Sequence, residues 1–150
     1  MEIKVALTLP RDAASVPVTR QVLDCCLERL GVVADTRADI ALALSEACAN
    51  VIQHAGPGEE YEVVASTREG RCVIEVLDSG SALGDGATTA RPVDPATLMS
   101  EHGRGLKIID AVTDGLMLTG DSRAGTTVHF EKVLDFEPGA LAEQVAGVSR

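Results

Sequence analysis

Residues 45–55 read SEACANVIQHA, an apolar run in which Glu46 and Asn50 stand one helical turn apart. The sequence around this run predicts a helix that starts near Asp35-Thr36 and stops at about Ala55, before a Gly-Pro-Gly turn. Its large apolar residues recur at helical spacing and form one stripe, which comprises Ile40, Leu44, Ala47 and Val51 and is widened by Ala41, Cys48 and Ile52. Glu46 and Asn50 therefore lie at the border of a core-facing stripe, where the helix is expected to meet a cleft.

The two polar side chains have complementary chemistry. The carboxylate of Glu46 can accept a proton from a hydroxyl group or from water, and the amide oxygen of Asn50 can bind Mg²⁺, which prefers oxygen ligands. Such pairs also occur at ordinary helix edges, so this pair alone does not define a function.

The composition limits the class of protein. The chain has 150 residues, of which 45% are hydrophobic and only 2% aromatic, so we expect one globular domain with a core of Val, Leu, Ile and Ala. So few aromatic residues argue against a surface that stacks single-stranded nucleic acid. The net charge of −10 disfavours both DNA and an anionic membrane as partners. No apolar run approaches the length of a membrane span, and we expect a cytoplasmic protein.

Hydrophobic periodicity and turn residues predict the order β-α-α-β-β-loop-α-β-β. The expected elements cover residues 3–9, 15–30, 35–55, 61–67, 72–77, 105–112, 116–119 and 126–133. This order predicts an α/β sandwich, in which a mixed, largely antiparallel sheet carries helices on one face. The segment from residue 80 to Glu101 is long and rich in Gly, Ala, Thr and Pro, as is typical of a lid. We expect one domain over residues 1–134 and an acidic, loosely held tail over 135–150.

The sequence also predicts which residues of the first helix are buried and how the cysteines are placed. The apolar residues of the helix over 15–30 suggest that Val18, Val22, Cys25, Cys26 and Leu30 face inward. The four cysteines lack metal-ligand spacing, and we expect all of them to be small buried residues in a reducing compartment.

Three further segments have residues suited to nucleotide binding. Asp78-Ser79-Gly80 ends a buried strand, and the carboxylate of Asp78 can accept a hydrogen bond from an exocyclic amine such as N6 of adenine. In Gly103-Arg104-Gly105-Leu106, glycines open a helix whose free N–H groups can face an anion. In Gly125-Thr126, a hairpin ends and Thr126 begins the last strand. Each segment also has an ordinary structural explanation, as a turn, a helix start or a strand.

The order of the four segments along the chain resembles the GHKL superfamily of ATP-binding domains, which have the Bergerat fold. Within it, the chain is most similar to the small anti-sigma-factor serine/threonine-protein kinases. Residues 45–55 resemble the Asn-containing helix of that branch, and the three later segments resemble its glycine boxes in sequence order. The resemblance extends from Ile3 to about Val133.

The resemblance implies a role for each residue that binds the triphosphate. Asn50 would ligate Mg²⁺ bound to the phosphates, and Glu46 would be the general base that activates a serine hydroxyl on a protein substrate. Gly103-Arg104-Gly105-Leu106 would hold the phosphates through backbone N–H groups. His54 continues the face near Asn50, and a histidine without a ligand is an equally good interpretation of this position.

The resemblance also implies how adenine is bound. Asp78 would accept a hydrogen bond from the adenine amine, Gly80 would allow the base to approach, and Thr126 would support the base. The chain departs from the family pattern at Ala82, where the first glycine box often has a further glycine. This departure concerns the lid more than the recognition of adenine.

Two functions remain open at this point. The resemblance implies an ATP- and Mg²⁺-dependent kinase that sequesters a sigma factor and phosphorylates a small anti-sigma-factor antagonist. The alternative is a catalytically silent ATP-binding switch that regulates a partner by binding only. Glu46 favours the kinase because a protein that only binds needs no base there. A detached histidine-kinase domain fits less well because none of the three histidines lies on a suitable N-terminal helix. Related kinases are often dimers, so a homodimer is also possible.

Overall fold

The computed structural model describes residues 2–54, 60–78, 92–93, 104–121 and 125–140. The helices are α1 (Ser15–Arg29), α2 (Ala34–His54) and α5 (Arg104–Val112). The strands are β1 (Ile3–Pro10), β2 (Glu60–Arg68), β3 (Arg71–Asp78), β4 (Pro92–Val93), β5 (Gly115–Asp121) and β6 (Gly125–Val133). The predicted order of elements is confirmed, and the structure adds the short strand β4 within the segment expected to form the lid.

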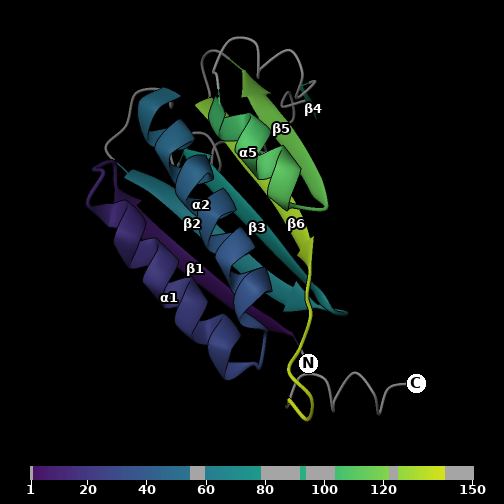
Figure 1. The fold of residues 1–150 in the computed structure, drawn as a ribbon. Helices are drawn as coiled ribbons and strands as arrows, with labels where there is room; N and C mark the ends of the chain where they lie inside the picture. Colours follow the sequence, from purple (N-terminus) through teal and green to yellow (C-terminus); the bar gives the residue numbers. More distant parts are fainter. Residues whose placement is uncertain (1, 55–59, 79–91, 94–103, 122–124, 141–150) are drawn as a thin grey trace.

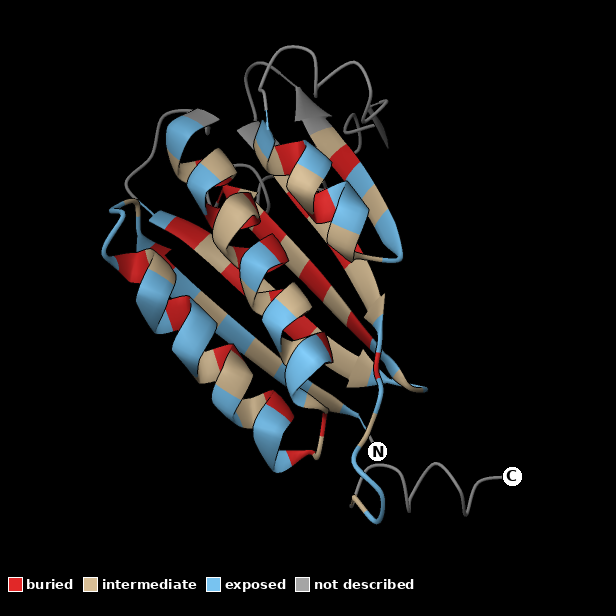
Figure 2. Cartoon of the chain, viewed as in Figure 1, coloured by how far each residue is buried: buried red, intermediate tan, exposed pale blue. Residues whose placement is uncertain are grey.

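The strands form one sheet in the order β1-β2-β3-β6-β5-β4, and every described pairing in it is antiparallel. The three helices lie side by side over one face of this sheet (Figure 1). Along β2 and β3, buried residues alternate with partly exposed ones, because successive side chains of a strand point to opposite faces (Figure 2). The predicted α/β sandwich with helices on one face is therefore confirmed.

A two-residue turn joins β2 to β3. Glu69 and Gly70 both have positive φ angles, of 53° and 75°, which are typical of the type I′ turn that matches the twist of a hairpin. This turn pairs Tyr61 with Asp78 at the opposite end of the hairpin. The geometry of the turn therefore determines where Asp78 lies at the end of the central strand β3.

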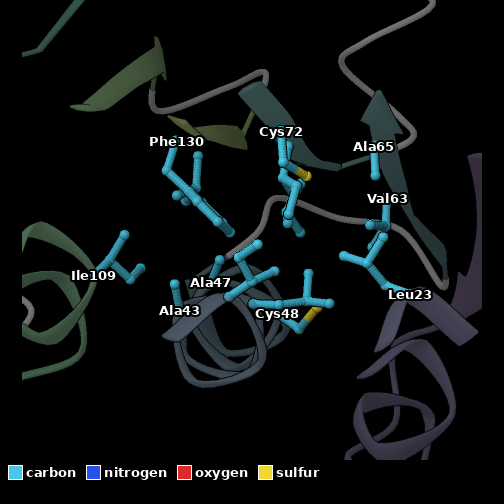
Figure 3. Close-up of a cluster of buried hydrophobic side chains, with 14 of the residues drawn as sticks. Leu23, Ala43, Ala47, Cys48, Val63, Ala65, Cys72, Ile109 and Phe130 are labelled. Carbon is cyan, nitrogen blue, oxygen red and sulfur yellow. The ribbon is translucent and has the colours of Figure 1, made fainter. Parts of the chain in front are cut away.

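The buried stripe of α2 is the one that its sequence predicts. Ile40, Leu44, Ala47 and Val51 are each at most 1% exposed. Ala43 is also fully buried, which the sequence did not predict. Figure 3 shows the side chains of α1, α2, α5 and the sheet meeting in this core, among them Leu23, Ala47, Ile109 and Phe130.

The prediction for α1 was mostly wrong about which residues are buried, although Leu30 at the end of the helix is buried as expected. Its buried residues are Ser15, Thr19, Leu23 and Leu27, whereas Val18 is 52% exposed. The buried hydroxyl groups are satisfied by hydrogen bonds, since Thr19 Oγ1 donates to the Ser15 carbonyl at 3.1 Å and Ser15 Oγ lies 2.6 Å from Tyr61 Oη. Two buried polar residues are therefore tolerated on the inner face of α1, and the helix turns its leucines rather than its valines toward the sheet.

The expectation that all four cysteines are buried was also wrong. Cys48 and Cys72 are fully buried, and burial raises the pKa of each thiol to about 12. Cys25 is exposed and Cys26 is partly exposed, because neither lies on the buried face of α1 described above.

Residues 135–140 run along the turn between α1 and α2. The Val33 N–H donates to the Asp135 carbonyl at 2.9 Å, and the Glu137 N–H donates to the Gly31 carbonyl at 2.7 Å. Gly31 has a φ of 89°, and Ala140 occupies the space that a side chain at Gly31 would need. The expected tail beyond residue 140 lies outside the described residues, and the division of the chain at residue 134 stays a prediction.

Candidate nucleotide site between α2 and α5

Helices α2 and α5 pack against each other in opposite directions. Near the start of α2, Asp39 pairs with Lys132 at 3.2 Å, and Lys132 Nζ also donates to the carbonyl of Val112, the last residue of α5. About two turns later on α2, the carboxylate of Glu46 lies beside Gly105, in the first turn of α5. The N-terminus of α5 is therefore directed toward the C-terminal half of α2, where Asn50 follows Glu46.

Asp39 and Glu46 are seven positions apart on α2, which is about two helical turns, or roughly 10 Å along the helix axis. Gly105 and Val112 are also seven positions apart on α5. The two contacts therefore agree with one antiparallel alignment of the helices. One further turn of α2 places Asn50 roughly 6 Å beyond Glu46 along the helix, on the side of the α5 N-terminus.

Small residues of α2 allow this close approach. Ala43 and Ala47 are fully buried, while Glu46 and Asn50 are partly exposed beside them. Leu106 and Ile109 of α5 are buried in the same core and hold the helix in place. Glu46 and Asn50 thus lie at the border of the buried stripe, as their spacing in the sequence predicts.

The first turn of α5 has the electrostatic character of a helix start. Helix α5 begins at Arg104, whose side chain is exposed, and the first N–H groups of a helix have no partner within it. The helix dipole adds partial positive charge at this end. The start of α5 therefore favours a bound anion, and Asn50 lies on the same side of α2 as this helix end.

Asp78 lies at the end of the central strand β3 and is 1% exposed. It follows the buried residues Ile74 and Val76 at the spacing that places all three on the helix-covered face of the sheet. Because Leu77 pairs with Thr127, the backbone of Thr126 in β6 is adjacent to Asp78 across the sheet. A buried carboxylate at a strand end can accept a hydrogen bond that selects a ligand.

Several predicted site residues lie outside the described residues. These are Gly80 and Gly103, together with the side chains of His54 and Thr126. The structure thus places the Glu46 carboxylate beside Gly105, and it places Asp78 and the Thr126 backbone side by side. The assigned roles of the site residues stay predictions.

The structure adds Arg11, which the sequence analysis did not identify. Its Nη2 donates to the carbonyl of Ile52 at 3.0 Å, in the last turn of α2. A cation at a helix C-terminus is stabilised by the helix dipole and satisfies an end carbonyl. No local pattern marks Arg11 for this contact, because its partner lies 41 residues away.

The described side chains could hold Mg²⁺ only if phosphate oxygens supplied further ligands. Among the described residues, no group of three or more His, Cys, Asp or Glu side chains is arranged to hold a metal ion. Mg²⁺ in nucleotide sites commonly takes one or two protein oxygens, with phosphate oxygens and water as the other ligands. The amide oxygen of Asn50 suits that type of coordination.

Comparison with known proteins identifies the family. Residues 9–132 match the family model for the histidine kinase-like ATPase domain. The chain therefore belongs to the histidine kinase-like ATPase domain family.

Its relatives include proteins named serine-protein kinase RsbW. The chain is 29% identical over 141 residues to RsbW of Bacillus mycoides strain KBAB4, with 89% of this chain and 87% of the relative covered. It is 30% identical over 142 residues to RsbW of Bacillus thuringiensis strain Al Hakam and of Bacillus cereus strain 03BB102, with the same coverage. None of the helices in the described ranges has the length and apolarity that a membrane span requires.

Proposed function

We propose that this protein is an ATP-dependent protein serine kinase that sequesters a sigma factor and phosphorylates a small anti-sigma-factor antagonist. The position of the Glu46 carboxylate beside Gly105, in the first turn of α5, is the observation that carries the proposal. A base at this position supports transfer from a phosphate bound at the start of α5. The similarity to serine-protein kinases over 89% of the chain supports the same function.

ATP would supply the phosphoryl group, and Mg²⁺ would neutralise charge on the phosphates. Asn50 would contribute an oxygen ligand to the metal, and the N–H groups at the start of α5 would bind phosphate oxygens. Asp78 would accept a hydrogen bond from the adenine amine. These residues come from α2, α5 and β3, so the site depends on how these three elements pack.

Glu46 would act on the protein substrate. Its carboxylate would accept the proton of a serine hydroxyl while the serine oxygen bonds to the terminal phosphorus and the bond to the ADP oxygen breaks. A general base of this kind contributes about 10²- to 10⁴-fold to a rate. Glu46→Gln should therefore abolish most transfer while preserving ATP affinity.

The experiment combines two measurements on the full chain. Calorimetric titration with ATP, with and without Mg²⁺, tests binding. Incubation with [γ-³²P]ATP and a panel of small antagonist proteins tests transfer, with Glu46→Gln as the variant and Gln53→Glu, on the exposed side of α2, as the matched control. Failure to bind ATP in either condition would refute the nucleotide site.

Sigma-factor sequestration needs its own assay. Pull-down with candidate sigma factors, in the presence of ATP or ADP, should recover one of them. Binding of ATP without transfer to any acceptor, together with sigma-factor regulation that survives Glu46→Ala, would instead support the silent binding switch. Dimerisation of the chain is a separate proposal, which sedimentation equilibrium tests.

A further inference from the structure

We infer that Gly105 is a positioning residue for the carboxylate of Glu46. The inference rests on the proposed role of Glu46 as the general base and adds a reason why position 105 has no side chain. A Cβ atom at Gly105 would lie 3.2 Å from Oε1 of Glu46. This separation is shorter than an ordinary van der Waals contact, so the carboxylate would have to move by a few tenths of an ångström.

The backbone does not require glycine at this position. Among the described glycines, positive φ angles occur at Gly31, Gly70 and Gly139, and Gly105 is not one of them. Alanine therefore fits the conformation of Gly105, and it is a much better helix former. Glycine at this place in α5 weakens the helix, and the adjacent carboxylate provides a physical reason for its presence.

The contact involves the movable end of a side chain. Apart from chain neighbours and its own helix backbone, the one described atom within 4 Å of the added Cβ is Oε1 of Glu46. Gly105→Ala should therefore fold normally, because a carboxylate can shift without disturbing the core. The shift would still matter to catalysis, since a displacement of about 1 Å can lower a rate about 100-fold.

A competing explanation is that glycine lets the backbone approach the phosphates. Alanine retains the backbone N–H, so the two explanations differ in what they predict. Loss of phosphate approach raises the Kd and KM for ATP. Displacement of Glu46 lowers kcat and leaves the Kd for ATP within about twofold of its original value.

The matched control is Gly115→Ala. Gly115 begins β5, and a Cβ there meets nothing within 4 Å. The Gly115→Ala variant therefore makes the same glycine-to-alanine change without adding an atom close to Glu46. Gly105→Ala should lower kcat for Mg-ATP turnover about 5- to 30-fold and raise the melting temperature by about 2–4 °C, whereas Gly115→Ala should leave kcat unchanged.

A double-mutant cycle tests whether Gly105 acts through Glu46. In a Glu46→Gln background, Gly105→Ala should cause no further loss of kcat, because the base is already absent. An equal loss in both backgrounds, or a Kd for ATP raised tenfold or more by Gly105→Ala, would overturn the inference.

A measurement without nucleotide separates this inference from the proposed function. Carboxyl ¹³C NMR of the ATP-free protein should show a changed chemical shift of the Glu46 carboxyl carbon in Gly105→Ala and no change in Gly115→Ala. If Glu46→Gln retains full turnover, the proposed base fails, and the NMR comparison still decides whether Gly105 positions the carboxylate. An unchanged chemical shift of the Glu46 carboxyl in Gly105→Ala would refute the positioning role whatever the turnover.

Discussion

Asp78→Asn gives the sharpest test of how the nucleotide would be selected. Asp78 is 1% exposed at the end of β3, so solvent screens its charge little. The substitution keeps the size of the side chain and removes its charge. One of the two carboxylate oxygens becomes an NH₂ group, which cannot accept a hydrogen bond from the adenine amine.

The size of the effect follows from the burial of the carboxylate. A hydrogen bond to a charged group contributes about 1.5–3 kcal/mol, and about 1.4 kcal/mol corresponds to a tenfold change in affinity. The Kd for ATP should therefore rise about 10- to 100-fold. Inosine triphosphate has a carbonyl in place of the amine, so the wild type should bind it less tightly than ATP, and Asp78→Asn should lose that preference.

Isothermal titration calorimetry with both nucleotides measures these changes. Urea unfolding checks that Asp78→Asn remains folded, and Asp110→Asn on the exposed side of α5 is the charge-matched control. A folded Asp78→Asn variant that binds ATP within twofold of the wild type would show that this carboxylate does not select adenine.

Two further predictions concern stability. Ser15 Oγ donates to the Asp12 carbonyl at 2.7 Å, so Tyr61 Oη donates to Ser15 Oγ, and Tyr61→Phe should lower the free energy of unfolding by about 1–2 kcal/mol in urea titrations; an unchanged midpoint would contradict this. Glu75 raises the pKa of His129 and His129 lowers that of Glu75, so their attraction is complete between about pH 4.5 and 6.5 and declines outside this range. His129→Gln should therefore destabilise the protein by less than about 1 kcal/mol at pH 6 and have less effect at pH 9 or pH 3, and a loss independent of pH would refute the ion pair.

The buried face of α2 was predictable because local periodicity contains enough information. Large apolar residues at helical spacing must face the core, and Glu46 and Asn50 follow at its border. The same reasoning failed for α1, where Ser15 is buried. Its partner, Tyr61, lies 46 residues away, and no local pattern reveals that hydrogen bond.

The sequence by itself determined the fold class, the order of the elements and the set of candidate site residues, because these depend on periodicity, turn chemistry and motif order. Only the tertiary structure decided that α2 and α5 run in opposite directions and that the Glu46 carboxylate lies beside Gly105, which is 59 residues away. Such contacts depend on how buried surfaces from distant segments fit together. The physical reason is that spacing along a chain specifies which face of an element is apolar, whereas packing specifies which other element that face meets.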